Sequence, residues 1–272
     1  MSVREPLVEA WEQVAEPVIG MVHLRALAGS AGYRGELEYV RAAMMRDATA
    51  LVDGGVDGLL VENFGDVPFY PGKVPREVVA QMTALVAEVR QTWPDMPLGV
   101  NVLRNDGCAA IAVAHAAGAD FVRVNVLCGA RVTDQGIVQG VAHEVMRLRR
   151  ALGIEWVKVL ADVDVKHSSP LGGGMSIADE VADLIHRGLA DALIVTGSGT
   201  GKATGMEQLQ AVREAAADEV DVLVGSGVTA ESIADYRGKT DGYIVGTGVK
   251  VEGKAEHAVD SGRVRELIKA RG

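Results

Sequence analysis

The stretch 156–197 reads WVKVLADVDVKHSSPLGGGMSIADEVADLIHRGLADALIVTG and contains one complete unit of the pattern that decides the fold. A β-branched run (156–163) is followed by a helix-like segment (177–191) and then by a second β-branched run (192–197). Alternation of short apolar runs with longer amphipathic segments is typical of strand–helix–strand units in a parallel sheet. Six further runs repeat the pattern: PVIGMVHL (17–24), GLLVEN (58–63), LGVNVL (98–103), FVRVNV (121–126), DVLVGSG (221–227) and DGYIVGTG (241–248).

Eight strand–helix repeats without a break in composition predict an α/β fold, a single (β/α)8 TIM barrel formed as one domain by residues 1–272. A doubly wound open sheet is the alternative. Residues 1–16 precede the first run, and we expect them to form an N-terminal extension helix that packs on the bottom of the barrel. The chemistry of such barrels lies in the loops at the carboxyl ends of the strands.

Composition narrows the class of partner to small molecules. The 272 residues carry a formal net charge of −10, which disfavours both nucleic acid and anionic membranes. Aromatic residues make up 4% of the chain, too few for a surface on which bases stack. With two cysteines, no secretory signal pattern and no apolar run long enough to span a membrane, we expect a cytoplasmic protein.

Side-chain parity predicts an unusually polar barrel interior. Successive side chains of a strand face opposite ways, and the valines of FVRVNV and WVKVLADVDV should face the helices. The opposite faces of these two strands then carry polar groups into the barrel. Glu62 and Asn101 occupy inward positions on two other strands and belong to the same polar set. The inward set is Arg123, Asn125, Lys158, Asp162 and Asp164, with the apolar Leu160 among them.

Charged groups in a dry interior need partners, so these residues pair either with one another or with a ligand. An architectural ion-pair network is the alternative that suits Arg123 and Lys158, which lie lower in their strands. For the acids at strand ends we favour contact with a ligand. The predicted catalytic residues are Asp162, Asp164, Glu62 and His167, and the predicted substrate-binding residues are His23, Asn63, Asn101, Arg123, Asn125 and Lys166.

Three successive strands end in glycine-rich loops, which lets backbone N–H groups approach an anion. We expect inorganic phosphate, as a co-substrate, or a phosphoryl group to bind there, helped by the N-terminus of a helix in TAESIADY (229–236), with Thr229 as its cap. Tight turns without a ligand are the alternative. The predicted phosphate-binding residues are Gly197, Gly199, Gly225, Ser226, Gly227, Gly246, Thr247 and Gly248.

Other motifs are excluded or secondary. TGSGTGKATG (196–205) lacks the first glycine and the final Ser/Thr of a nucleotide-binding P-loop. The sequence shows no HxH, HExxH or CxxC spacing, so no metal site is predicted, although the strand-end acids are compatible with Mg²⁺. The long segment 64–76, with Phe69 and Tyr70, is either a lid or a loop folded on the barrel rim. Cys128 is predicted to be a small apolar neighbour rather than a nucleophile.

The motifs together resemble the BtpA family over residues 17–264. The resemblance is carried by GMVHL (20–24), ENFGDVPF (62–69), GVNVLRND (99–106), FVRVNV, TDQGI (133–137), ADVDVKH (161–167), IVTGSGTG (194–201), LVGSGVT (223–229) and GYIVGTGVK (242–250). It implies a phosphate-binding type of barrel. The family name comes from a factor for photosystem I biogenesis, and other members look associated with sugar or nucleoside metabolism.

The leading hypothesis is an enzyme that acts on a nucleoside or a phosphorylated sugar, with phosphate-dependent cleavage of an N-glycosidic bond, as in a nucleoside phosphorylase, as its favoured reaction. A sugar-phosphate isomerase or aldolase is the first alternative; of the lysines near strand 156–163, Lys158 lies too deep for a Schiff base, which leaves Lys166. A non-catalytic assembly factor, which should expose an apolar patch, is the second. We also expect a homo-oligomer.

Overall fold

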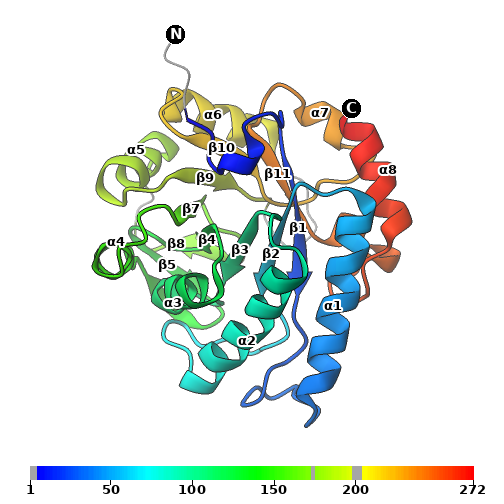
Figure 1. The fold of residues 1–272 in the computed structure, drawn as a ribbon. Coiled ribbons are helices and arrows are strands. Elements are labelled where there is room, and N and C mark those ends of the chain that lie inside the picture. Colours follow the sequence, from blue (N-terminus) through cyan, green and yellow to red (C-terminus); the bar gives the residue numbers. More distant parts are fainter. Residues whose placement is uncertain (1–4, 173–174, 198–203) are drawn as a thin grey trace.

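A computed structural model describes residues 5–172, 175–197 and 204–272. Within them, eight parallel strands close into a barrel in the order β1-β11-β10-β9-β7-β4-β3-β2, which confirms the predicted fold class (Figure 1). Each predicted strand is present. The barrel strands are β1 (Val18–His23), β2 (Gly58–Glu62), β3 (Leu98–Asn101), β4 (Phe121–Val124), β7 (Lys158–Val163), β9 (Ala192–Val195), β10 (Asp221–Val224) and β11 (Gly242–Val245).

Helices surround the barrel, and their apolar faces pack against the outward-facing valines and leucines of the strands. The first helix is terminated by the residue that follows it, Gly55, whose φ of 94° is readily adopted only by glycine. The helices are α1 (Leu37–Gly54), α2 (Arg76–Thr92), α3 (Gly107–Ala117), α4 (Ala142–Ala151), α5 (Ile177–Ala182) with the π-helical turn η2 (Asp183–Arg187), α6 (Met206–Ala216), α7 (Ile233–Tyr236) and α8 (Ser261–Arg271). In the described residues, no helix is long and apolar enough to cross a membrane.

The bottom of the barrel is closed by the N-terminal segment. Instead of the expected helix, the described part of residues 1–16 contains a single 3-10 turn, η1 (Glu9–Trp11). Trp11 is buried, packs against Phe121 at 5.8 Å between ring centroids, and donates its indole N–H to the Asp57 carbonyl at 2.7 Å. The Trp11 side chain thus closes this end of the barrel, and the predicted N-terminal helix is not needed for it.

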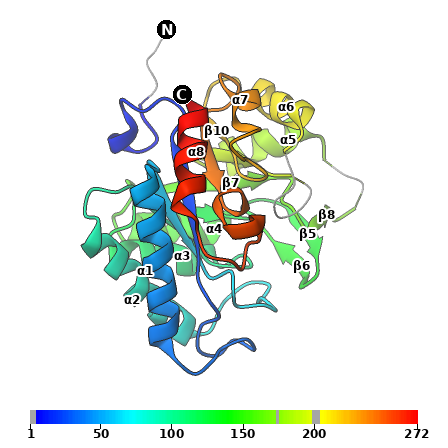
Figure 2. The same cartoon turned by 90° about the vertical axis from the view of Figure 1, so that its right-hand side faces the viewer.

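A small antiparallel sheet stands beside the other end of the barrel and was not predicted from the sequence. It consists of β6 (Gly136–Gln139), β5 (Ala130–Thr133) and β8 (Ser168–Pro170), in that order. Its first two strands follow β4 and its third follows β7, so the sheet ties together the loops of two neighbouring barrel strands (Figure 2).

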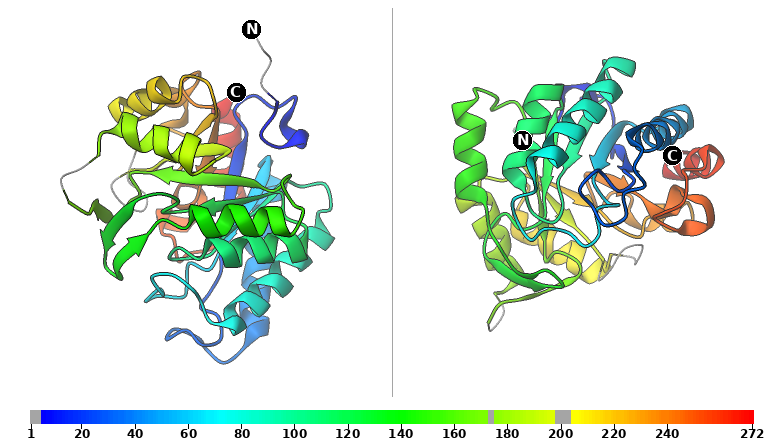
Figure 3. Two further views of the ribbon diagram at one scale, coloured as in Figure 1. Left: turned by 90° about the vertical axis from the view of Figure 1, so that its left-hand side faces the viewer. Right: turned by 90° about the horizontal axis from the view of Figure 1, so that it is seen from below.

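The loops after β1 and β2 lie at the same end of the barrel, opposite the end covered by the N-terminal segment (Figure 3, left). Two short turns follow the last strand, η3 (Thr247–Val249) and η4 (Val251–Gly253), before the chain enters α8. Because all barrel strands are parallel, their carboxyl ends meet here. This end is called the mouth below.

Candidate active site at the mouth of the barrel

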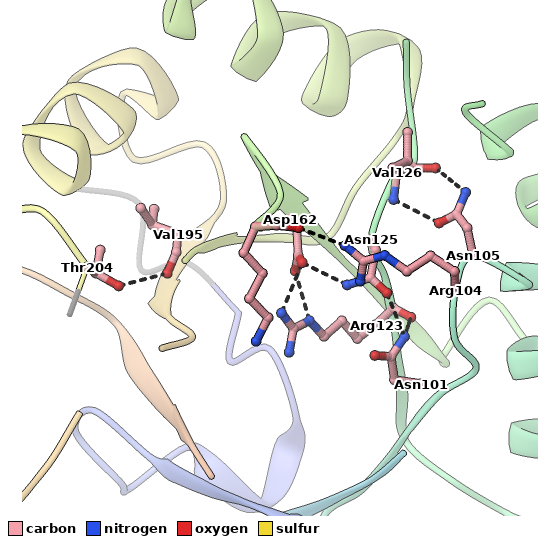
Figure 4. Close-up of polar contacts among 10 residues, drawn as sticks. Asn101, Arg104, Asn105, Arg123, Asn125, Val126, Asp162, Val195 and Thr204 are labelled. Atoms are coloured by element: carbon pink, nitrogen blue, oxygen red, sulfur yellow. Dashed lines mark hydrogen bonds and ion pairs between the residues drawn. The ribbon is translucent and has the colours of Figure 1, made fainter. Parts of the chain in front are cut away.

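A buried ion pair joins two neighbouring strands inside the mouth. Arg123 on β4 donates from Nε and one Nη to the two carboxylate oxygens of Asp162 on β7, at 2.8 and 2.9 Å (Figure 4). Both side chains are almost completely buried. The amide of Asn125 donates to the same carboxylate at 2.8 Å. These contacts confirm the prediction, made from strand alternation, that the three side chains face into the barrel. Both oxygens of the Asp162 carboxylate accept hydrogen bonds from Arg123 or Asn125.

Asn101 on β3 extends this network around the barrel. Its amide nitrogen donates to the Arg123 carbonyl at 2.9 Å and lies 3.3 Å from the Asn125 side-chain oxygen. Its own side-chain oxygen is buried and has no hydrogen-bond partner within the part of the chain that the structure describes. A buried acceptor without a partner is costly, so this oxygen is available to accept a hydrogen bond from a ligand.

Glu62 at the end of β2 is the second buried acid. Burial raises its pKa above the ordinary value of a glutamate, although Arg123 and Lys166 act in the opposite direction. Its Oε1 lies 3.7 Å from Nε2 of His23 on β1. Glu62 therefore keeps a proton to a higher pH than an exposed carboxyl group, which is the property of a general acid.

His23 is held on several sides. Its ring stacks on Phe64 at 4.4 Å between centroids, and its Nδ1 lies 3.4 Å from the Ala255 carbonyl. Gly246 leaves the space above the ring edge, since a Cβ there would lie 3.3 Å from Cε1. Burial lowers the pKa of His23 well below its ordinary value, and the charge of Lys250 adds to the effect. The imidazole is thus neutral at pH 7.

Two further cations face the same centre. Burial lowers the pKa of Lys166, which follows β7, and the nearby charge of Arg123 lowers it further. Arg104, in the loop after β3, is 6% exposed and donates to the Lys166 carbonyl at 2.7 Å. This bond links the loops after β3 and β7 across part of the mouth.

Among the described residues, the charged groups at this centre are Glu62 and Asp162 on the acidic side and Arg104, Arg123 and Lys166 on the basic side; the exposed Asp134, in the turn between β5 and β6, also acts on Arg104. With a neutral imidazole, three cations face two carboxyl groups inside the mouth, and the third carboxylate is exposed to solvent at its edge. Because the pKa of Glu62 is raised, the imbalance increases whenever that group holds a proton. A site with surplus positive charge, shielded from water, favours an anionic ligand.

Asp164 was predicted to face into the barrel, and this is wrong. Strand β7 ends at Val163, and Asp164 adopts a φ of 47°, so the alternation of a strand no longer applies. Its carboxylate is half-exposed and pairs with Arg131 of β5. Its backbone N–H donates to Glu180 at 3.0 Å. Asp164 therefore fastens the small sheet to the barrel instead of lining the site.

Two other predicted site residues, Lys158 and His167, lie outside the buried centre of the mouth. Lys158 begins β7 opposite the inward-facing Phe121 and lies with residues of the N-terminal segment around a cavity at the bottom, so it is far from the polar groups of the mouth. His167 is exposed, with a φ of 58°, and precedes β8. Its location in the loop follows the prediction, whereas its catalytic role stays a prediction.

Asn63 faces away from Glu62 and holds the mouth loops in place. Its side-chain oxygen accepts from Leu103 N at 2.7 Å, and its amide donates to the buried Asp66 at 3.0 Å. Asn105 does similar work after β3, since it exchanges hydrogen bonds with the backbone of Val126 at 2.8 and 2.9 Å (Figure 4). These bonds support the site without pointing into it.

Sequence reasoning missed Arg104 as a mouth residue. The signal was present, since LRND (103–106) follows one residue after the inward-facing Asn101 and places a basic residue just beyond the end of the strand. Strand periodicity says nothing about a residue beyond the last strand position. The loop geometry, which turns the guanidinium back over the barrel, was therefore not predictable from parity.

The glycine loops after β10 and β11 lie against each other. A Cβ on Gly248 would be 2.3 Å from the Val228 carbonyl oxygen, and one on Gly225 would be 2.4 Å from the Ile194 side chain. Gly227 has a φ of 69°. Close packing explains why Gly225 and Gly248 are glycines, and a left-handed turn explains Gly227. The alternative of tight turns without a ligand thus has a structural basis, and phosphate binding by these loops stays a prediction.

The remaining predicted phosphate residues have mixed outcomes. Gly197 and Ser226 are buried at the ends of their strands, Thr247 begins η3, and Gly199 lies outside the described residues. The helix expected over 229–236 is reduced to the single turn α7, with Ser232 rather than Thr229 at its N-cap position and no side-chain capping bond. Any anion bound here would rely on loop backbone more than on a helix terminus.

The loop 64–76 borders a cavity of about 340 Å³ together with residues 29–31. Phe69, Tyr70 and Val78 line it, and the Tyr70 carbonyl accepts a hydrogen bond from Arg104 N at 3.0 Å. The loop is thus attached to a mouth residue, and its action as a lid stays a prediction. Within the described residues, no group of three or more His, Cys, Asp or Glu side chains has the arrangement of a metal site.

Comparison with known proteins places the chain among close relatives. The profile of the BtpA family matches residues 14–271. An uncharacterized protein of Thermococcus kodakarensis is 45% identical over 93% of this chain and 94% of its own length. The photosystem I biogenesis protein BtpA of Synechocystis is 43% identical over 95% of this chain and 88% of its own length.

Solved structures share the fold at low identity. N-(5'-phosphoribosyl)anthranilate isomerase from Pyrococcus furiosus has a TM-score of 0.56 at 14% identity and covers 94% of this chain and 98% of its own. 3-Keto-L-gulonate-6-phosphate decarboxylase from Vibrio cholerae has the same score and identity, with 95% and 98% covered. Both names specify a phosphorylated substrate, and at this identity the likeness establishes the barrel alone.

Proposed function

This chain belongs to the BtpA family, and from that premise we propose that it is an enzyme acting on a sugar substrate that carries or requires phosphate, bound at the mouth of the barrel. The observation that supports the proposal most is the buried acid Glu62, with a raised pKa, facing a centre that also holds the cations Arg104, Arg123 and Lys166. Acid–base chemistry on an anion-containing substrate needs this combination.

Within this class we propose phosphate-dependent cleavage of an N-glycosidic bond. The bond between the base nitrogen and C1 of the sugar breaks while a phosphate oxygen forms a bond to C1. Protonated Glu62 gives its proton to the departing base, and the resulting carboxylate takes up the proton that the phosphate loses. The products are the free base and a sugar 1-phosphate, so protons and charge balance.

The other mouth residues have supporting roles in this reaction. Asp162 is saturated by Arg123 and Asn125, so it orients the guanidinium rather than stabilising charge on the sugar ring directly. Arg104 and Lys166 hold the phosphate against the sugar and favour its anionic form. The unpartnered oxygen of Asn101 accepts a hydrogen bond from a sugar hydroxyl.

A second candidate reaction is isomerisation or aldol cleavage of a sugar phosphate. It is favoured by Lys166, which lies at the mouth and whose pKa is lowered by burial. A lysine that loses its proton more readily can attack a carbonyl carbon and form a Schiff base. The solved neighbours whose names specify phosphorylated sugars support the same reading.

One assay separates the reactions. The protein is incubated with a panel of nucleosides with and without phosphate, and free base is measured by chromatography. In parallel, borohydride reduction in the presence of sugar phosphates, followed by mass spectrometry, detects a Schiff base on Lys166. Release of base only with phosphate supports phosphorolysis, whereas a reduced adduct on Lys166 supports the second reaction.

Failure of both arms, together with no thermal stabilisation by phosphate or ribose phosphates, would contradict an enzymatic role and favour an assembly factor. That outcome would also agree with the name of the Synechocystis relative, a photosystem I biogenesis protein.

A further inference from the structure

The chain after β11 forms a closed loop over His23, and its base is fixed by backbone bonds. Lys250 and Val259 form an antiparallel bridge, Val251 N donates to the Ala258 carbonyl at 3.0 Å, and Asp260 N donates to the Val249 carbonyl at 2.9 Å. Residues 251–259 are called the strap below. The two ends of the strap are adjacent, because Val259 pairs with Lys250. The position of the strap therefore depends on the contacts made at these two ends.

A buried charge pair holds both ends. Lys250 lies directly before the strap, is 1% exposed, and donates from Nζ to the carbonyl of His257 inside the strap at 3.2 Å. Its Nζ is 3.8 Å from Oδ2 of Asp47 on α1, which is 2% exposed. The other oxygen of Asp47 accepts from Val259 N, the last residue of the strap, at 3.3 Å.

Buried charges are costly unless they are paired and hydrogen-bonded, so this pair restricts the strap to one arrangement. The partially exposed Arg46 also contacts Asp47, at 2.9 Å, and adds a second cation to the carboxylate. Burial lowers the pKa of Lys250 to about 8, an effect that Asp47 opposes. The cluster occupies the end of the GTGVK motif, which the proposed reaction leaves without a role.

The strap positions one atom over the site. The carbonyl of the buried Ala255 lies 3.4 Å from Nδ1 of His23, and the neighbouring Glu256 carbonyl accepts a hydrogen bond from Arg25. A carbonyl oxygen can only accept, so Nδ1 carries the single ring proton of a neutral imidazole. Nε2 then presents a lone pair toward Glu62, 3.7 Å away.

We infer that Lys250 and Asp47 are positioning residues: by pinning the strap, they fix His23 in the Nδ1–H tautomer and keep its Nε2 available to exchange a proton with Glu62. Only the last clause rests on the proposed function. In histidines generally, a hydrogen bond to one ring nitrogen determines whether the other nitrogen carries the proton.

Several charged groups face His23, and the test must separate their effects. They are Glu62 on β2, Arg123 on β4, Lys166 after β7 and Lys250 after β11, and the ring of Phe64 covers one face. Replacing Lys250 removes a charge as well as the anchor of the strap. Asp47→Asn loosens the same anchor while the Lys250 side chain stays in place, although its pKa falls further without the Asp47 charge, so the two variants are used together.

The experiment measures the ring nitrogens of His23 by ¹⁵N NMR, with assignment from the loss of the signal in His23→Gln. The wild-type protein should show a protonated Nδ1 and an unprotonated Nε2 at pH 7. Lys250→Met and Asp47→Asn should each convert this into an average of both tautomers. Lys250→Arg should restore the wild-type pattern, and Lys254→Met, an exposed strap residue paired with Glu252, should not alter it.

A wild-type protein with its proton on Nε2 would overturn the inference without any variant, even if Lys250→Met failed to fold. So would folded Asp47→Asn protein with an unchanged Nδ1–H tautomer. In the phosphorolysis assay, Asp47→Asn should lower kcat about 100-fold with little change in KM, the size expected when a remote change displaces a reacting group. Absence of wild-type turnover would count against the proposed reaction and leave the NMR result standing.

Discussion

The two halves of the mouth are built on different principles. The half formed by β2, β3, β4 and β7 carries charged and amide side chains that hold one another through buried hydrogen bonds, as Arg123 and Asp162 do. In the half formed by β10 and β11, close backbone packing around glycines takes the place of side chains. Hydrogen-bonded pairs fix the positions of the side chains in the first half. In the second half, glycines without a Cβ allow the loops to pack closely and so fix their positions.

This difference shows how one barrel end can present two kinds of recognition. Paired side chains present charges at fixed positions to the reacting part of a substrate, because the partner of each side chain prevents it from moving. Closely packed glycine loops offer backbone N–H groups to an anion. The two halves should therefore respond differently to substitution, and five predictions test that expectation from the largest effect to the smallest.

The largest effect is expected from Arg123→Met, which leaves the Asp162 carboxylate buried without its main partner. Breaking a buried pair by removing one member costs about 3–5 kcal/mol of unfolding free energy. Denaturant titration at pH 7 measures the loss. The control is Arg131→Met, whose partner Asp164 is half-exposed, and which should cost less. A loss below about 1 kcal/mol for Arg123→Met would show that pairing does not secure this half.

Glu62→Gln should lower kcat for phosphate-dependent release of base by about 100-fold or more, the usual contribution of a general acid. Because the folded-state pKa of Glu62 is raised, the native state holds this proton more tightly than the unfolded chain. Wild-type activity should therefore fall as pH rises through the raised pKa, and the variant should lack this decline.

The same variant makes a stability prediction with a defined sign. Between the ordinary glutamate pKa and the raised one, the native state binds more protons, so wild-type stability decreases as pH rises. Glu62→Gln removes the buried ionisation and should be at least as stable as the wild type at pH 8, by thermal melting. A variant that is clearly less stable at pH 8 than at pH 5, relative to the wild type, would contradict the raised pKa.

In the glycine half, Gly248→Ala should cost about 1–3 kcal/mol, since its Cβ would press on the Val228 carbonyl and force two backbones apart. Phosphate should also stabilise the variant less than it stabilises the wild type in thermal-shift titrations. Gly72→Ala is the matched control, because a Cβ there has open space. Equal phosphate responses in all three proteins would mean that the loops after β10 and β11 do not bind the anion.

The smallest effect is expected from Asp164→Asn, which changes an acid outside the site. The free energy of unfolding should change by about 0.5 kcal/mol or less, as for most surface substitutions, and kcat should stay at the wild-type value. Asp162→Asn, two positions earlier, should behave like Arg123→Met because it leaves a buried guanidinium underpaired. If the two asparagine variants behaved alike, the contrast between an inner and an outer acid would be wrong.

The sequence alone determined the order of strands and helices and the inward face of most strands. Period-two alternation in FVRVNV and WVKVLADV is a local property, so Arg123, Asn125 and Asp162 could be placed inside the barrel before any contact was known. The placement of Asp164 failed for the same local reason, since the strand ends one residue before it and the backbone turns.

Only the tertiary structure decided which of these groups meet. Arg123 and Asp162 are 39 residues apart and become partners because β4 and β7 pair directly in the barrel, although β5, β6 and α4 lie between them in the sequence. The strap lies 232 residues from His23 along the chain, at the Ala255 contact, and reaches it because β1 and β11 close the barrel. Local periodicity fixes the direction of a side chain, whereas its partner depends on barrel closure and loop paths, which no short stretch of sequence encodes.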